Sequence, residues 1–279
     1  MLDIFQYAFM QKAFLVGLLI AVITPCIGMI VVLKRLSMIG DSLSHNSLAG
    51  VAAGLAFGFN PIIGAVIFSV TAAFGIERIR KAFPQYAEIA IAVIMSTGIG
   101  FAGVLSGFVK NSASFNSFLF GSIVAITDFE LYIVLGLSSI VMLAVLLLYK
   151  ELFYVTFDEE SARLAGVPIK VVDFIFTLLT AITISISART VGALVISSLM
   201  VLPVATAMQF ARSYKQTMIY SILIAIFCTM MGLYVSYYGG LKPGGTIVLV
   251  GVLVLLLVIA YKNVIRKIFL KRVSIGNAN

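Results

Sequence analysis

The sequence predicts an all-α fold, a polytopic bundle of transmembrane helices, and three observations support this prediction. Of the 279 residues, 62% are hydrophobic and only 11% are charged, with a mean hydropathy of +1.16. A soluble surface needs far more charge than this. Apolar runs of about 20 residues, the length that crosses a bilayer as a helix, recur along the whole chain. The alternating segments of an outer-membrane barrel do not occur in the sequence.

We expect eight or nine spans in a single transmembrane domain that covers residues 1–279. The apolar runs that define the spans are 12–33, 42–58, 61–76, 88–109, 129–149, 171–187, 191–210, 217–235 and 245–262. A further apolar segment, residues 115–121, is too short to cross the bilayer, so a re-entrant or interfacial helix fits it.

Positive charges fall in short clusters between the apolar runs, at residues 34–35, 78–81, 150–170, 212–215 and 266–272. Nine spans place all of these clusters on one side of the membrane, which the positive-inside rule makes cytoplasmic. The N-terminus is then expected outside and the C-terminus inside. The net charge of +8 is thus a signal of topology, and it does not indicate nucleic-acid binding.

The stretch from Gly40 to Ser47 places ionisable and polar side chains inside an otherwise apolar sequence. Asp41 lies four residues before His45, the only histidine, so on a helix both side chains share one face. Ionisable groups inside a membrane are costly and usually mark a pathway or a site. In a purely structural alternative, Asp41 caps the helix that begins here and His45 makes one internal hydrogen bond. In the site interpretation, a twofold homodimer supplies two Asp and two His ligands, which suit zinc and can also hold manganese with added water.

Two further motifs have a recognisable pattern. Residues 157–167 predict a short amphipathic helix on the cytoplasmic side, with an acidic first turn and Gly166 at the C-terminal cap. Such a helix is either an ordinary solvated connection or an element that docks into the groove of a cytosolic partner. In residues 191–207, small side chains allow close helix packing, and Pro203 is expected to kink or break the helix and to provide a gate.

The three motifs together resemble the metal-ion permease family of ATP-binding-cassette (ABC) importers. The Gly-Asp and His pattern of the family is similar to residues 40–54, its acidic pattern to 157–166, and its Val-Gly and Pro pattern to 191–207. The chain departs from many relatives at Asn46, where they carry a small residue. This amide is expected either to support the metal ligands or to hydrogen-bond across a dimer.

The resemblance implies the fold of an ABC importer permease, working as a homodimer in the bacterial cell membrane. It implies two further partners, a cytosolic dimer of ABC ATPases and an extracytoplasmic metal-binding lipoprotein. It also implies that Asp41 and His45 bind the metal in the translocation path and that residues 158–166 form the coupling helix. The coupling residues are Asp158, Glu159, Ala162 and Gly166.

We therefore expect a lipid-embedded permease subunit that imports a divalent transition metal, zinc first and manganese or iron second. No catalytic activity and no permanent cofactor are expected, and ATP is used by the partner because the chain lacks a Walker-type loop. A proton-coupled secondary transporter, with Asp41 and His45 as a proton relay, is the alternative. It predicts an inverted repeat that is not evident in the sequence.

Overall fold

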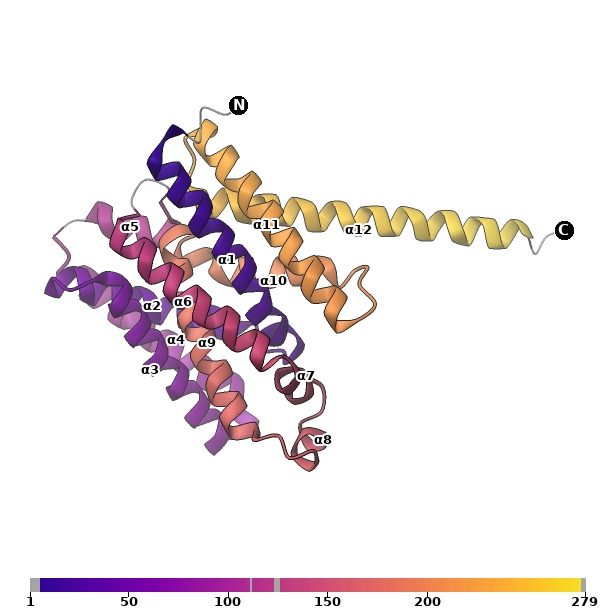
Figure 1. Ribbon diagram of the computed structural model, residues 1–279, viewed down its shortest axis with the longest axis horizontal. Coiled ribbons are helices and arrows are strands. Elements are labelled where there is room, and N and C mark those ends of the chain that lie inside the picture. The colour runs from indigo at the N-terminus through magenta and orange to yellow at the C-terminus, as the bar shows by residue number, and fades with distance from the viewer. Residues whose placement is uncertain (1–5, 111, 123–125, 277–279) are drawn as a thin grey trace.

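The protein is a bundle of helices, seen in a computed structural model that describes residues 6–110, 112–122 and 126–276 (Figure 1). The described residues contain helices and no strand, so the predicted all-α fold is confirmed. The helices of the first half are α1 (Ala8–Leu33), α2 (Met38–Phe57), α3 (Pro61–Ala82), η2 (Pro84–Tyr86), α4 (Ala87–Ser106), α5 (Ser112–Phe120) and α6 (Asp128–Leu147). Those of the second half are α7 (Tyr149–Phe157), α8 (Glu159–Leu164), α9 (Ile169–Thr190), η3 (Ala193–Val195), α10 (Ile196–Ala207), α11 (Tyr214–Gly239) and α12 (Pro243–Gly276).

Each predicted span corresponds to a helix, but not every one of these helices is long and apolar enough to cross a membrane. Within the described residues, seven helices are long and apolar enough by themselves: α1, α3, α4, α6, α9, α11 and α12. This number is lower than the eight or nine that we predicted. The two missing helices are α2, which carries the polar run from Asp41 to Ser47, and α10, which has only 12 residues.

Helix α2 lies inside the bundle and packs chiefly against α3 and α4. Glycines allow the α2–α3 crossing, because a Cβ atom built on Gly50 would lie 2.1 Å from the carbonyl oxygen of Gly64. On the α4 side, the Ser42 hydroxyl donates to the Ile91 carbonyl over 3.3 Å. The face of α2 that carries Asp41 is thereby held in one orientation by two neighbouring helices.

The chain breaks between α9 and α10, upstream of the predicted position. Pro203 lies buried inside α10, which continues to Ala207, so it does not break the helix, while the kink and the gate expected there stay predictions. The interruption is at Gly192, whose φ of +95° is a left-handed conformation that favours glycine. A Cβ atom here would lie 2.5 Å from the backbone nitrogen of Gly121, so the break is packed against the end of α5.

Several ion pairs gather at one end of the bundle. Here the end of α1 meets the start of α9 through an ion pair of Lys34 Nζ with Asp173 Oδ1, 2.9 Å long. Arg80 and Lys81, at the end of α3, both pair with Glu77. Residues from three of the predicted clusters, Lys34, Arg80 and Arg163, thus lie around one cleft, and their cytoplasmic position stays a prediction. For the cluster at 266–272 the structure describes the helical backbone but not the side chains.

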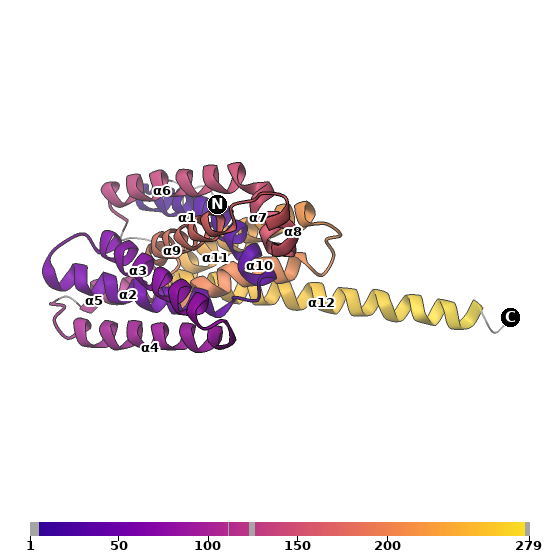
Figure 2. The same cartoon turned by 90° about the horizontal axis from the view of Figure 1, so that it is seen from below.

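Two features extend the predicted architecture. Helix α7 occupies residues for which we predicted a connection, and it leads directly into α8. The 34-residue helix α12 packs against α11 and α10 with its first part and then extends well beyond the bundle (Figure 2).

Candidate metal site and coupling surface

Asp41 and His45 lie on a face of α2 that the rest of the bundle does not cover completely. Asp41 is in the first turn of α2 and is exposed, while His45 is partly buried one turn later. Residues at this spacing on a helix have Cβ atoms about 6 Å apart, close enough for both side chains to bind one ion. Asp41 does not cap α2, because the N-terminal cap position is Ser37.

The carboxylate of Asp41 has a partner from a distant part of the chain. The Ser197 hydroxyl, in the first turn of α10, donates a hydrogen bond to Asp41 Oδ1. Gly40 allows this approach, since a Cβ atom at this position would lie 3.1 Å from Ser197 Cβ. From the sequence, Ser197 was expected only to be one of the small residues that allow close packing. The adjacent serines 197 and 198, within a mainly apolar run, were the feature that could have indicated a polar role.

Asn46 has a structural role that we did not predict. Its side chain is buried, and Nδ2 donates to the Ser42 carbonyl at 2.9 Å and to the Ile94 carbonyl at 3.0 Å. Both acceptors belong to the same chain, so this amide joins α2 to α4. The close approach of Gly98, whose Cβ would lie 2.6 Å from Asn46 Nδ2, fits this link.

The pair of Asp41 and His45 is not a complete metal site in one chain. Among the residues that the structure describes, no group of three or more His, Cys, Asp or Glu side chains could hold a metal ion. Two donors on an open helix face require further ligands from water or from a second molecule.

A short helix lies within the predicted stretch 157–167, but α8 covers only Glu159–Leu164, and its cytoplasmic position stays a prediction. Asp158 is its N-terminal cap and accepts hydrogen bonds from the backbone nitrogen of Ser161 at 3.0 Å and from its hydroxyl at 2.5 Å. These bonds hold the pKa of Asp158 below the usual range of an aspartate, and the bond from the Ser161 hydroxyl contributes more than the bond from the backbone nitrogen. Gly166 follows the helix with a φ of +80°. The short helix therefore has a defined start and end.

One side of α8 is anchored and the other is open. Ala162 is completely buried, whereas Leu164 is 90% exposed. Glu159 faces the neighbouring cleft and forms a long, exposed ion pair with Arg163, 3.6 Å between Arg163 Nη2 and Glu159 Oε1. Leu164 therefore stays at the surface, beside the charged groups of this end of the molecule.

A charged cleft lies beside α8. Its volume is about 790 Å³, and the ends of α1 and α3, the region from α7 to α8 and the start of α9 all contribute to it. The lining residues are Lys34, Leu36, Arg80, Lys81, Val155, Thr156, Phe157, Glu159, Arg163 and Asp173. Four of these side chains are cationic and two are anionic, so the lining has an excess of positive charge and does not suit a metal cation.

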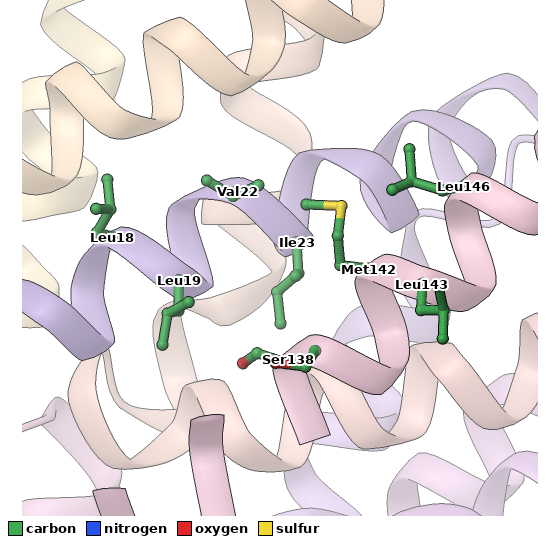
Figure 3. Close-up of a pocket in the computed structure, with 9 residues that line it drawn as sticks. Leu18, Leu19, Val22, Ile23, Ser138, Met142, Leu143 and Leu146 are labelled. Atoms are coloured by element: carbon green, nitrogen blue, oxygen red, sulfur yellow. The ribbon is translucent and has the colours of Figure 1, made fainter. Parts of the chain in front are cut away.

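A hollow of a different kind lies between α1 and α6 (Figure 3). Its volume is about 430 Å³, and aliphatic side chains from both helices line it together with Met142, Ser138 and Ser139. It contains no charged or imidazole group, so it lacks the donors that a divalent cation needs. Two apolar helices border this hollow, which suits lipid chains rather than an ion.

Comparison with known proteins gives matches along nearly the whole chain. The ABC 3 transport family matches residues 6–262. A probable metal transport system membrane protein of Treponema pallidum is 38% identical, with 93% of this chain and 97% of that protein covered.

Relatives named for two different metals are about equally similar to this chain. The manganese transport system membrane protein MntC of Listeria monocytogenes is 30% identical, with 89% of each chain covered. The high-affinity zinc uptake system membrane protein ZnuB of Haemophilus influenzae is also 30% identical, with 88% of this chain and 94% of that protein covered. Among solved structures, PsaBC from Streptococcus pneumoniae in complex with Fab matches with a TM-score of 0.82 and 26% identity, covering 90% of this chain and 91% of that one.

Proposed function

This chain belongs to the ABC 3 transport family, and from that membership we propose that it imports a divalent transition-metal ion, zinc first, as the permease of an ABC importer. The family consists of transport permeases, and seven of the helices that the structure describes are apolar and long enough to cross a bilayer. It is a multi-pass protein of the cell membrane.

The observation that carries the metal assignment is the incomplete donor pair on α2. Asp41 and His45 present one oxygen ligand and one nitrogen ligand on a face that the bundle leaves open. A second copy related by a twofold axis would add the same two ligands and complete a set of four. Two nitrogen and two oxygen donors match the tetrahedral preference of zinc, and manganese would need added water. Membership in a family with relatives named for zinc and manganese agrees with this cargo.

Energy for import comes from partner proteins in this proposal. The sequence has no Walker-type loop, so ATP hydrolysis belongs to a cytosolic ATPase dimer. Helix α8, with Leu164 exposed beside the charged cleft, is the surface that the ATPase contacts. An extracytoplasmic lipoprotein delivers the ion at the opposite face. ATP-driven closure of the ATPases then moves α8, and the site opens inward.

Uptake of labelled zinc and manganese by cells tests the site. Asp41→Ala and His45→Ala should each abolish accumulation of the preferred ion while the protein is expressed and assembled normally. Glu88→Ala, which removes an exposed carboxylate from the first turn of α4, is the matched control and should transport normally. Normal uptake by both site variants would contradict the assignment.

Two further measurements separate this proposal from its alternatives. The complex reconstituted with its ATPase should bind one zinc ion for two permease chains, which checks the homodimeric site. Uptake into vesicles should require ATP. Uptake driven by a pH gradient without ATP would instead support a proton-coupled carrier.

A further inference from the structure

The contact between Asp41 and Ser197 joins two elements that do not follow each other in the chain. Asp41 belongs to α2, and Ser197 is in the first turn of α10, 156 residues later. Neither side chain is fully buried: Asp41 is exposed and Ser197 is partly buried. The bond therefore connects a proposed ion ligand with a helix that supplies no proposed ligand itself.

The backbone around this contact makes the approach specific. Gly40 leaves room for Ser197, as a Cβ atom there would come within 3.1 Å of the serine Cβ. Gly192 turns the chain before η3 and is packed against the end of α5, so α10 begins beside α2. Farther along, α10 is seated on α1, because a Cβ atom on Gly28 would lie 2.2 Å from the carbonyl oxygen of Met200.

The chemistry of the carboxylate gives this bond a role. A carboxylate has two oxygens with about four acceptor positions, so one oxygen can accept from a hydroxyl while the other faces a cation. A hydroxyl donor of this kind limits rotation of the carboxylate and stabilises its charged form. Hydrogen bonds to the ligands of a metal tune its affinity, and their loss usually costs about 10- to 100-fold.

We propose that Ser197 is a positioning residue of the ion pathway. Its hydroxyl holds the Asp41 carboxylate in the orientation that binds the ion, and it thereby makes the affinity for the ion depend on the position of α10. This inference rests on the proposed function of Asp41. When α10 shifts away from α2, the carboxylate loses its donor and the affinity for the ion falls. The break at Gly192 allows α10 to shift without carrying the whole of α9 with it.

The test is zinc uptake by Ser197→Ala, with KM and maximal rate determined separately. KM should rise about tenfold while the maximal rate is kept, because the carboxylate remains but is less well oriented. Ser197→Thr restores a hydroxyl and should restore KM. Ser198→Ala changes the adjacent serine, which is also partly buried; it is the matched control and should leave KM unchanged. Basal ATP hydrolysis of the assembled complex without metal checks that each variant folds.

A second measurement distinguishes positioning from a general structural effect. Equilibrium zinc binding by the reconstituted complex should weaken on Ser197→Ala in the wild-type background but not further in an Asp41→Asn background. An unchanged KM for Ser197→Ala, an equal rise for Ser198→Ala, failure of threonine to rescue, or equal losses of binding in both backgrounds would each overturn the proposal. If Asp41→Ala itself transports normally, the proposed function fails. If Asp41→Ala is inactive and Ser197→Ala behaves like the wild type, only this inference fails.

Discussion

The ion pair of Lys34 and Asp173 permits a quantitative prediction. The side chains of Lys34 and Asp173 are only 16% and 12% exposed, and Lys34 Nζ also lies 5.7 Å from the centre of the Phe176 ring. At 2.9 Å and an effective dielectric constant of about 20, the attraction is about 6 kcal/mol before desolvation. Burial of the two charges costs several kcal/mol for each ion, so the net value of the pair is small.

Removing one partner is a different perturbation, because it leaves a poorly hydrated charge alone. Breaking a fully buried pair costs about 3–5 kcal/mol, and breaking an exposed one about 0–1 kcal/mol. We expect Lys34→Met to lower the free energy of unfolding by about 2–3 kcal/mol, since a small part of Asp173 still reaches solvent. The double variant Lys34→Met with Asp173→Leu should lie within about 1 kcal/mol of the wild type, because neither charge remains.

Reversible unfolding in mixed micelles measures both values. The control is the pair of Lys12 with Asp128, whose side chains are 27% and 76% exposed, so Lys12→Met should cost less than about 1 kcal/mol. A loss below about 1 kcal/mol for Lys34→Met, or a double variant as unstable as the sum of the singles, would refute the reasoning from burial.

Three other predictions follow from single positions. Gly50→Ala should destabilise the protein by about 3 kcal/mol or more and abolish uptake, because the new Cβ atom would lie 2.1 Å from the Gly64 carbonyl oxygen. The control Gly136→Ala places its Cβ atom in open space and should change stability by less than about 0.5 kcal/mol. Arg35→Gly should stabilise the protein by about 1 kcal/mol in the same unfolding assay, because Arg35 has a φ of +57° that costs a non-glycine residue energy. Asp158→Ala should reduce metal-stimulated ATP hydrolysis of the reconstituted complex and leave zinc binding intact, because it removes the cap of α8 but no ion ligand; full stimulation would argue against α8 as the coupling helix.

Hydropathy predicted the position of the helices because a helix that crosses the bilayer needs about 20 mainly apolar residues, whichever helices it packs against. Charge also predicted which ends lie together, as Lys34 and Arg80 line the same cleft. The run from 191 to 210 was the exception. It contains no charged residue, and the packing of Gly192 against the end of α5 interrupts it.

The candidate site was predictable only in part, for a related reason. Asp41 and His45 could be paired from their spacing on one helix, since that pairing is local. The bond of Ser197 with Asp41 depends on a contact between residues 156 positions apart, and the two acceptors of Asn46 depend on how α4 packs. No periodicity in a single segment contains this information.

A route of contacts leads from the proposed ion site to the coupling surface. Asp41 is bonded to α10, α10 is seated on α1, and the end of α1 is bonded through Lys34 to Asp173 on α9, which lines the cleft beside α8. Continuity of contacts is not by itself coupling, so it needs a functional measurement.

The double variant Lys34→Met with Asp173→Leu supplies this measurement, because it is expected to restore stability without restoring the bond between α1 and α9. If the ion pair transmits movement between the ATPase and the site, this variant should bind zinc with normal affinity yet show reduced stimulation of ATP hydrolysis by zinc. The Lys12→Met control, at the opposite end of α1, should show normal stimulation. Full stimulation in the stable double variant would mean that α1 and α9 move together through their packing alone, and that the ion pair only orders this end of the bundle.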